Sequence, residues 1–286
     1  MKYINSLNLE DDMMKNSKKL AALALSLAMT GSLAACGGNA NTPASADDNQ
    51  AAGIMYAVEA GSAGEAIAKE NGYTYNAVSS QADALMEVAS GTSEAAIIDL
   101  LMAGAMIGEG TSYPDLTYTD RLTEEEYGVG CRQDSDLTDY INTVFAEAYA
   151  DGTMAALADT YAISQDVLVE QSEPAEFTPA EDGDVAYIQD KGTLIVGITE
   201  FAPMDYKDEN GEWIGFDADL AKLVAEKLGV EAQFVVIDWD NKIMELNSKN
   251  IDVVWNGMTL TDEVTSSMNC TNAYCKNAQV VITAAQ

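Results

Sequence analysis

The stretch "GTLIVGITEFAPMDYKDENGEWIGFDADLAKLVAEKLG", residues 192–229, contains two hydrophobic patterns in succession. Its first eight residues, "GTLIVGIT", form a short continuous apolar run, which predicts a buried strand. From Phe216 onward the apolar residues recur every three or four positions, which predicts an amphipathic helix that Asp217 can cap and Gly229 can end. A strand followed by such a helix is the repeating unit of α/β sheets.

The same alternation extends along most of the chain. The runs "IMYAV", "YTYNAV" and "AAIID" predict strands, and "SQADALMEVASG" predicts a helix that Gly91 closes. Two further helices are predicted at about residues 137–149 and 154–161. Residues 164–185 are acidic and contain two prolines with little apolar periodicity, so they predict a linker. The chain therefore predicts two α/β lobes of roughly 100 residues each.

The charge balance excludes some classes of function. The 286-residue chain has 14 basic and 47 acidic residues and a net charge of −33. Nucleic-acid binding depends on basic side chains that neutralise phosphates, so a nucleic-acid partner is not expected. The chain has no histidine, the commonest general base and metal ligand, which argues against an enzyme. No Cys/His spacing suggests zinc, and we expect neither a metal nor a cofactor.

The N-terminal region predicts export. Residues 14–36, "MKNSKKLAALALSLAMTGSLAAC", begin with lysines, continue with an apolar stretch and end with small residues, as a signal peptide does. The final "LAAC" resembles the lipobox of bacterial lipoproteins, which implies that Cys36 carries the lipid anchor; the alternative is a chance match in an alanine-rich segment. Residues 37–52 predict a flexible tether. Residues 1–36 are thus expected to be a signal peptide with a lipobox, of which residues 1–13 are a short upstream extension.

Three other cysteines allow two alternatives. Cys270 and Cys275 are close in sequence and an exported protein permits a disulfide between them, which would leave Cys131 unpaired. The other alternative is three buried thiols.

Several motifs together resemble the polar-amino-acid solute-binding proteins of ABC transporters. Phe201-Ala202-Pro203 is similar to the aromatic-x-Pro segment of that family's first lobe, and Gly215-Phe216-Asp217 to its helix start. "DVVWNGMTLTDEV" and "TNAYCKNAQVVI" resemble the end of that lobe and the first hinge strand. "YAVEAGSAGEAIAKENG", "ALMEVASGTSEAAIID" and "YGVGCRQDSDL" resemble the second lobe and the return strand. "FAEAYADGTMAALADTYAI" resembles the C-terminal helices. The resemblance implies an α/β, two-lobed periplasmic-binding-protein-like fold of type II.

The order of these segments differs from the order in the family. The resemblance implies a second lobe at 53–128, a return strand and C-terminal helices packing on the first lobe at 129–163, the linker at 164–185, the first lobe at 186–275 and a hinge strand at 276–286. A circular permutation, with the old ends joined by the linker, explains this order because termini that lie close together tolerate joining. The alternatives are a gene fragment, a fusion of two binding-protein halves, and a domain-swapped pair of chains.

The resemblance also implies ligand-binding residues in the second lobe, at the C-terminal ends of strands where α/β sheets bind ligands. Asp99 matches the acidic residue that takes a ligand's α-ammonium; its alternative role is to cap the next helix. In "GSAG", residues 61–64, the backbone N–H groups could hold a carboxylate at a helix N-terminus, and the alternative is an ordinary capped turn. The residues expected to bind here are Ser62, Ala63, Gly64 and Asp99.

The first lobe is expected to supply an aromatic group and a cradle. Phe201 matches an aromatic that stacks on the ligand, although it could equally be core. Trp239 is expected to line the site, and Trp255 to belong to the core. A cradle of amide and hydroxyl groups is matched by Asn256, Gly257, Met258 and Thr259. The alternative for this run is a glycine turn with surface hydroxyls.

Val264 departs from the family pattern. It occupies the position where relatives have an arginine that forks onto the ligand's carboxylate, a role that valine cannot perform. Either helix N–H groups and hydroxyls hold the carboxylate alone, or Arg132 near the hinge helps, or the ligand is not an ordinary α-amino acid. The other arginine, Arg121, is also in the half that resembles the second lobe and return strand.

Together these features predict a solute receptor without a catalytic step. It would be extracytoplasmic, held at the membrane through its lipid anchor, and would deliver a small amino-acid-like ligand to an ABC permease. The alternative is a non-transport sensor, or a gene fragment or fusion without full binding activity.

Overall fold

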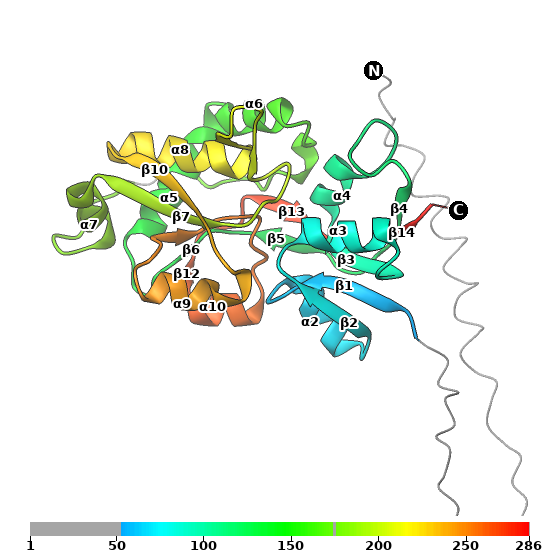
Figure 1. The fold of residues 1–286 in the computed structure, drawn as a ribbon. Coiled ribbons are helices and arrows are strands. Elements are labelled where there is room, and N and C mark those ends of the chain that lie inside the picture. Colours follow the sequence, from blue (N-terminus) through cyan, green and yellow to red (C-terminus); the bar gives the residue numbers. More distant parts are fainter. Residues whose placement is uncertain (1–52, 174–175, 286) are drawn as a thin grey trace, which may run out of the picture. The chain divides into compact units, whose positions relative to one another are not determined.

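Two five-stranded sheets organise the residues that the structure, a computed structural model, describes: 53–173 and 176–285. The predicted signal peptide, Cys36 and the tether lie outside these residues. We call the two halves of the described chain the second lobe, built on the sheet that contains β1, and the first lobe, built on the sheet that contains β7 (Figure 1). The predicted α/β class with two lobes is confirmed.

The second-lobe sheet has the strand order β2-β1-β3-β14-β4. Strands β1 and β2 are parallel, β1 and β3 are parallel, and β14 is antiparallel to both of its neighbours. Helix α2 covers one face, and α3 and α4 cover the other (Figure 1). The elements are β1 (Met55–Glu59), α2 (Ala63–Glu70), β2 (Thr74–Val78), α3 (Gln81–Ser90), β3 (Ala95–Asp99), α4 (Leu100–Met106), β4 (Leu116–Arg121) and β14 (Gln279–Ala284).

The first-lobe sheet has the equivalent order β10-β7-β11-β6-β12, in which β6 is the antiparallel strand. Helix α8 lies on one face, and α9 and α10 lie on the other (Figure 1). The elements are β6 (Gly130–Cys131), β7 (Thr193–Ile198), α8 (Phe216–Leu228), β10 (Glu231–Val236), the 3-10 turn η3 (Trp239–Asn241), α9 (Lys242–Asn247), β11 (Val253–Val254), α10 (Asp262–Ser267) and β12 (Asn269–Cys270). A small hairpin, β8 (Tyr206–Lys207) with β9 (Trp213–Ile214), precedes α8.

Each lobe contributes one strand to the sheet of the other. The chain enters the first lobe through β6 after leaving β4, and it returns to the second lobe through β14 after leaving β12. Between these strands, β5 (Glu125–Tyr127) and β13 (Cys275–Asn277) pair antiparallel to each other. The two crossings therefore lie side by side and form a double connection between the lobes, which we call the hinge.

The segment between the two halves is attached to the first lobe. Helices α5 (Leu137–Ala150) and α6 (Thr153–Thr160) pack against the first lobe, α5 on β6 and α7, and α6 on α8. The predicted linker contains the 3-10 turn η2 (Gln165–Val167) and the first residues of α7 (Asp184–Lys191), a helix that the sequence analysis did not anticipate. The Asp136 carboxylate accepts hydrogen bonds from the backbone N–H groups of Ala180 and Val185, which fixes the linker's end to the start of α5.

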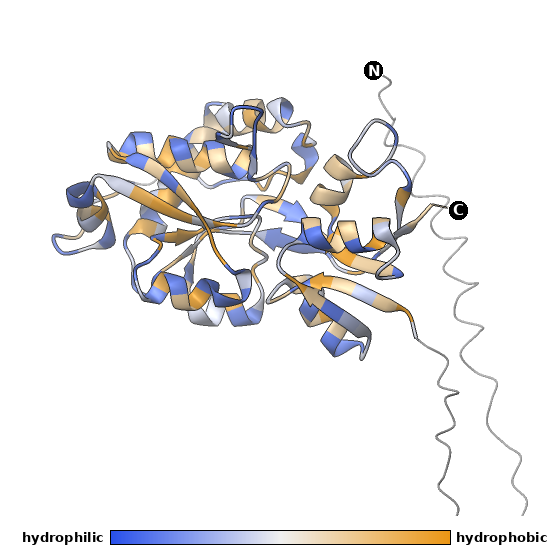
Figure 2. Cartoon of the chain, viewed as in Figure 1, coloured by the Kyte–Doolittle hydropathy of each residue, from blue (hydrophilic) through white to orange (hydrophobic). Residues whose placement is uncertain are grey.

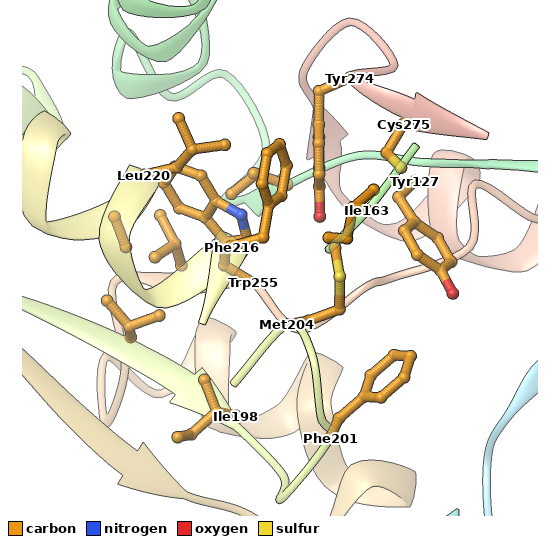
Figure 3. Close-up of a cluster of buried hydrophobic side chains, with 14 of the residues drawn as sticks. Tyr127, Ile163, Ile198, Phe201, Met204, Phe216, Leu220, Trp255, Tyr274 and Cys275 are labelled. Atoms are coloured by element: carbon orange, nitrogen blue, oxygen red, sulfur yellow. The ribbon is translucent and has the colours of Figure 1, made fainter. Parts of the chain in front are cut away.

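Hydrophobic burial follows the sheets. Strand β3 is buried along its whole length, as expected for a parallel strand covered on both faces. Figure 2 shows hydrophobic residues along β3 and β7 and hydrophilic residues on the outer turns of the helices. In the first lobe the rings of Phe216 and Tyr274 stack with centroids 6.2 Å apart, and Trp255 lies 6.5 Å from Tyr274 (Figure 3). Trp255 is fully buried there, as predicted.

Two local expectations are wrong. Asp217 does not cap α8: Gly215 holds the N-cap position, and the Asp217 side chain is fully buried below the helix start. The disulfide between Cys270 and Cys275 is not formed, and both residues, like Cys131, are free thiols. Cys270 belongs to the first-lobe sheet and Cys275 to the hinge, so their strands pair with different partners. None of the described helices is long and apolar enough to cross a membrane.

Candidate functional site

A cavity of about 220 Å³ lies between the two lobes. Sites for drug-sized ligands run to about 300–1,000 Å³, so this cavity suits a smaller metabolite. It is bounded by the ends of β1 and β3 and the first turn of α2 in the second lobe, and by η3, α10 and the segment after β11 in the first. The lining residues are Glu59, Gly61, Ser62, Ala63, Ala66, Gln81, Asp99, Phe201, Trp239, Lys242, Asn256, Gly257, Met258, Thr259, Thr261, Asp262, Glu263 and Val264.

Nine of the ten predicted ligand-binding residues line this cavity, and Gly64 does not. Gly64 packs against β3 instead: a Cβ at this position would lie 2.8 Å from the carbonyl oxygen of Ile97. Glycine is therefore needed there for close helix–strand packing. The structure brings the other predicted residues together from two lobes, because each follows the C-terminal end of a strand or begins a helix beside one.

In the predicted cradle, two groups are engaged within the first lobe. The Asn256 side chain donates to the carbonyl oxygen of Thr199 at 3.0 Å and accepts from the Thr199 N–H at 2.9 Å. The Gly257 N–H donates to the carboxylate of Asp217 at 2.6 Å. The expectation that this N–H faces a ligand is therefore wrong, since a buried carboxylate already accepts its hydrogen. Asn256 and Gly257 shape the cavity wall.

Gly257 also brings the cradle close to Phe201. Its φ of 55° lies in the left-handed region that glycine adopts without strain. A Cβ here would lie 2.5 Å from Cε1 of Phe201. Phe201 is 2% exposed, and its ring meets that of Tyr127 edge-on with centroids 6.4 Å apart. The Phe201 side chain thus combines both alternatives: it is packed in the core and also borders the cavity.

The turn before α2 is a variant of the capping box in which the Glu65 carboxylate reaches the residue before the N-cap. The Oγ of Ser62 accepts a hydrogen bond from the Glu65 N–H at 3.1 Å, and the Glu65 carboxylate accepts one from the Gly61 N–H at 2.8 Å. The alternative of an ordinary capped turn is therefore correct for the Ser62 oxygen. The Ser62 hydroxyl hydrogen is not used in this arrangement, and Ser62 and Ala63 still line the cavity.

Asp99 is held by a network of donors rather than by the helix that follows it. It occupies the N-cap position of α4, yet its side chain makes no capping hydrogen bond. Its Oδ1 accepts from the Tyr127 hydroxyl at 2.7 Å, from Gln279 at 3.0 Å and from Asn277, and its Oδ2 accepts from Gln81. Burial raises the pKa of Asp99 to about 6, although these hydrogen bonds favour the ionised form.

Asn277 and Gln279 connect Asp99 to the hinge. Both side-chain amides also donate to Glu125 Oε1, at 2.8 and 2.7 Å respectively. Burial and the nearby charge of Asp99 raise the pKa of Glu125 to about 7. The hinge strands thus supply the donors that orient the carboxylate of Asp99 at the cavity wall.

Two buried charged residues of the cavity were not identified from the sequence. Glu59 ends β1, is 3% exposed, and its Oε1 has no hydrogen-bond partner among the described residues. Burial and the charge of Asp99 raise the pKa of Glu59 to about 8. The signal was present in "YAVE", because Glu59 ends a strand just as Asp99 does.

Lys242 is the second of these residues, and it joins the lobes. It is 7% exposed, and its ammonium donates to the carbonyl oxygens of Gly61 at 2.8 Å and Trp239 at 3.2 Å. The ammonium also lies 5.1 Å from the centroid of the Trp239 ring. Burial lowers the pKa of Lys242. No sequence motif pointed to this residue.

No arginine lines the cavity. Val264 borders it in the first turn of α10 and packs in an apolar cluster with Trp239 and Met258. The suggestion that Arg132 helps to hold a ligand's carboxylate is wrong. Its guanidinium pairs with Asp184 at 3.0 Å and Asp252 at 3.5 Å, away from the cavity. Among the described residues, no group of three or more Cys, Asp or Glu side chains is arranged to hold a metal ion.

The fold and this cavity define a two-lobed α/β protein with a small ligand-sized site where the lobes meet. Residues 194–286 match the model of the family described as "Bacterial extracellular solute-binding proteins, family 3". This part of the chain is similar to that family. It includes most of the first lobe, the hinge crossing through β13 and β14.

Individual relatives match stretches of this chain that are about as long as the stretch matched by the family model. The chain is 36% identical over 85 residues to the L-cystine-binding protein TcyJ of Escherichia coli (strain K12), covering 29% of this chain and 32% of that protein. It is 36% identical over 108 residues to the L-cystine-binding protein TcyA of Bacillus subtilis (strain 168), covering 36% and 40%. Among solved structures, the Ancestral Cationic Amino Acid Solute Binding Protein (AncCDT-1) is 41% identical over 29% of this chain and 37% of that chain, with a TM-score of 0.29. The chain thus spans about a third of the length of the curated relatives it matches.

Proposed function

We propose that the protein is an extracytoplasmic solute-binding protein that captures a small polar ligand, an amino acid or a related amine, for an ABC importer. The observation that carries this proposal is a cavity lined by both lobes at the C-terminal ends of their strands, with Asp99 and Ser62 on one side and Phe201 and Trp239 on the other. A ligand that contacts both lobes stabilises their closed arrangement, because it gains its full set of contacts only there. Binding needs no cofactor and no catalytic step.

The proposal includes a permuted order of the two lobes. Two features support it: the two sheets have equivalent strand orders, and each contains one antiparallel strand supplied from the other lobe. A fragment with half of a binding protein would lack one of these exchanged strands. We further propose that Cys36 anchors the protein to the membrane and that residues 37–52 tether it.

The proposal is tested by calorimetric titration of the full chain, purified in detergent, with the common amino acids and simple amines. We expect at least one of them to bind, and Asp99→Ala to weaken that binding by tenfold or more, since a hydrogen bond to a charged group contributes about 1.5–3 kcal/mol. Glu109→Ala, at an exposed acid outside the cavity, serves as the control. Melting curves report whether each variant is folded. A complete absence of binding across the screen would refute the function.

A further inference from the structure

The cavity wall carries an excess of negative charge. Its titratable lining side chains are the carboxylates of Glu59, Asp99, Asp262 and Glu263, against the single ammonium of Lys242. Asp262 and Glu263 lie exposed in the first turn of α10, where solvent screens them. Glu59 and Asp99 are buried, so a negative charge on either carboxylate is screened much less and interacts more strongly with a charged ligand.

The hydrogen bonding of Glu59 is incomplete. Its Oε1 is buried and lacks a hydrogen-bond donor among the described residues, although buried polar atoms nearly always have one. The charged groups that act on Glu59 are Asp99 from β3 and Lys242 from α9, and the side chains of Thr199 and Gln81 lie close enough to favour its ionised form. The ammonium of Lys242 is itself directed to two backbone carbonyls. A ligand that brings a positive charge and N–H donors would satisfy Glu59.

Few of the groups that could hold a ligand's carboxylate are free, the Ser62 hydroxyl and the start of α2 being the exceptions. No arginine lines the cavity, Val264 presents an apolar side chain to it, Arg132 is paired elsewhere, and the Gly257 N–H donates to Asp217. The Lys242 ammonium already makes two hydrogen bonds to carbonyl oxygens. A carboxylate in this cavity would therefore face an excess of acidic groups with few free donors.

We propose that the ligand is an alkyl diamine without a carboxylate, with one ammonium bound by Glu59 and Asp99 and the other directed to Asp262 and Glu263. The inference rests on the proposed binding function and specifies its ligand class. Phe201 and Trp239 line the cavity and would provide apolar contacts for the methylene chain. The small cavity suits a chain of only a few carbons.

Two ligands that differ only by a carboxylate provide the test. 1,5-Diaminopentane is L-lysine without its α-carboxylate, and both are titrated into the full chain in detergent at pH 7. We expect the diamine to bind at least tenfold more tightly than lysine. Equal or tighter binding of lysine would overturn the proposal. If an amino acid from the wider screen binds and the diamine does not, the binding function stands and this inference fails; if nothing binds, the function itself fails.

Two measurements test whether Glu59 binds an ammonium of the ligand: the affinity of a Glu59 variant and the number of protons released on binding. Glu59→Gln should weaken diamine binding at least tenfold, whereas Glu109→Gln, which removes the same charge from an exposed site, should leave it unchanged. With its pKa raised to about 8, Glu59 is mainly protonated at pH 7 in the empty protein. Ionisation on binding releases up to about 0.9 proton per ligand, which titrations in buffers of different ionisation enthalpy measure in the wild-type protein. Tight diamine binding without this release, or an unaffected Glu59→Gln variant, would refute the role of Glu59.

Discussion

Asp217 lies beneath the cavity wall and gives the protein a testable dependence of stability on pH. Its carboxylate is fully buried and accepts hydrogen bonds from the Gly257 N–H at 2.6 Å and the Tyr274 hydroxyl at 2.7 Å. Trp255 Nε1 lies close enough to favour the ionised form without reaching hydrogen-bond geometry. Burial nevertheless outweighs these contacts and raises the pKa of Asp217 from 3.8 to about 7. Burial and the charge of Asp217 raise the pKa of the neighbouring Asp205 as well.

The sign and size of the effect follow from these values. The folded state holds the proton of Asp217 more tightly than the unfolded state does, so the corresponding stability is fully present below about pH 4 and is lost as the pH rises to about 7. Each pH unit between these limits lowers the free energy of unfolding by about 1.4 kcal/mol, up to about 4 kcal/mol in total. Asp217→Asn removes this titration, because an amide keeps the acceptor oxygen but carries no charge.

Urea denaturation at pH 5, 6, 7 and 8 measures the effect. We expect the free energy of unfolding of Asp217→Asn, relative to the wild type, to rise by about 2–3 kcal/mol between pH 5 and pH 7. A poorer contact between the new amide and Trp255 would shift the whole curve by a constant amount and leave this slope intact. Asp190→Asn, an identical change on the exposed face of α7, should run parallel to the wild type. If the Asp217→Asn curve also runs parallel, the assigned burial effect is wrong.

Two further substitutions test the packing around the site. Gly257→Ala should destabilise the protein by about 1–3 kcal/mol, because alanine is strained at a φ of 55° and its Cβ would meet Phe201; an unchanged melting temperature would contradict this. Arg132→Met should cost about 1–3 kcal/mol in urea denaturation, since it removes the guanidinium from the partly buried Asp184 and the buried Asp252, of which Asp252 still pairs with Lys191. Arg121→Met at an exposed position should cost little. Equal losses in the two arginine variants would show that the ion pairs of Arg132 are not what stabilises the fold.

Much of the fold follows from patterns that are local in the sequence. The apolar run of β3 and the three-to-four spacing of α8 predict a strand and a helix because each element must bury its own apolar face. The same rule failed for α7, because "DVAYIQDK" shows little apolar periodicity. Only Val185 and Ile188 of this short helix are buried.

The cavity residues were predictable to the extent that they end strands. Asp99, Phe201 and the residues after β11 follow strands whose C-terminal ends converge, so position alone brought them to one site. The direction of each polar group was not predictable in this way. The Gly257 N–H turns to Asp217, and Arg132 turns to Asp184, because buried charges far apart in the sequence must find partners.

The sequence by itself determined the two α/β lobes, the resemblance to solute-binding proteins and the absence of an arginine at position 264. Only the tertiary structure decided that β6 and β14 complete the sheets of the opposite lobes, and that Glu59 is buried in the cavity without a donor. The physical reason is that hydrophobic periodicity acts over a few residues, whereas strand exchange and charge pairing join segments that lie from about 40 to more than a hundred residues apart.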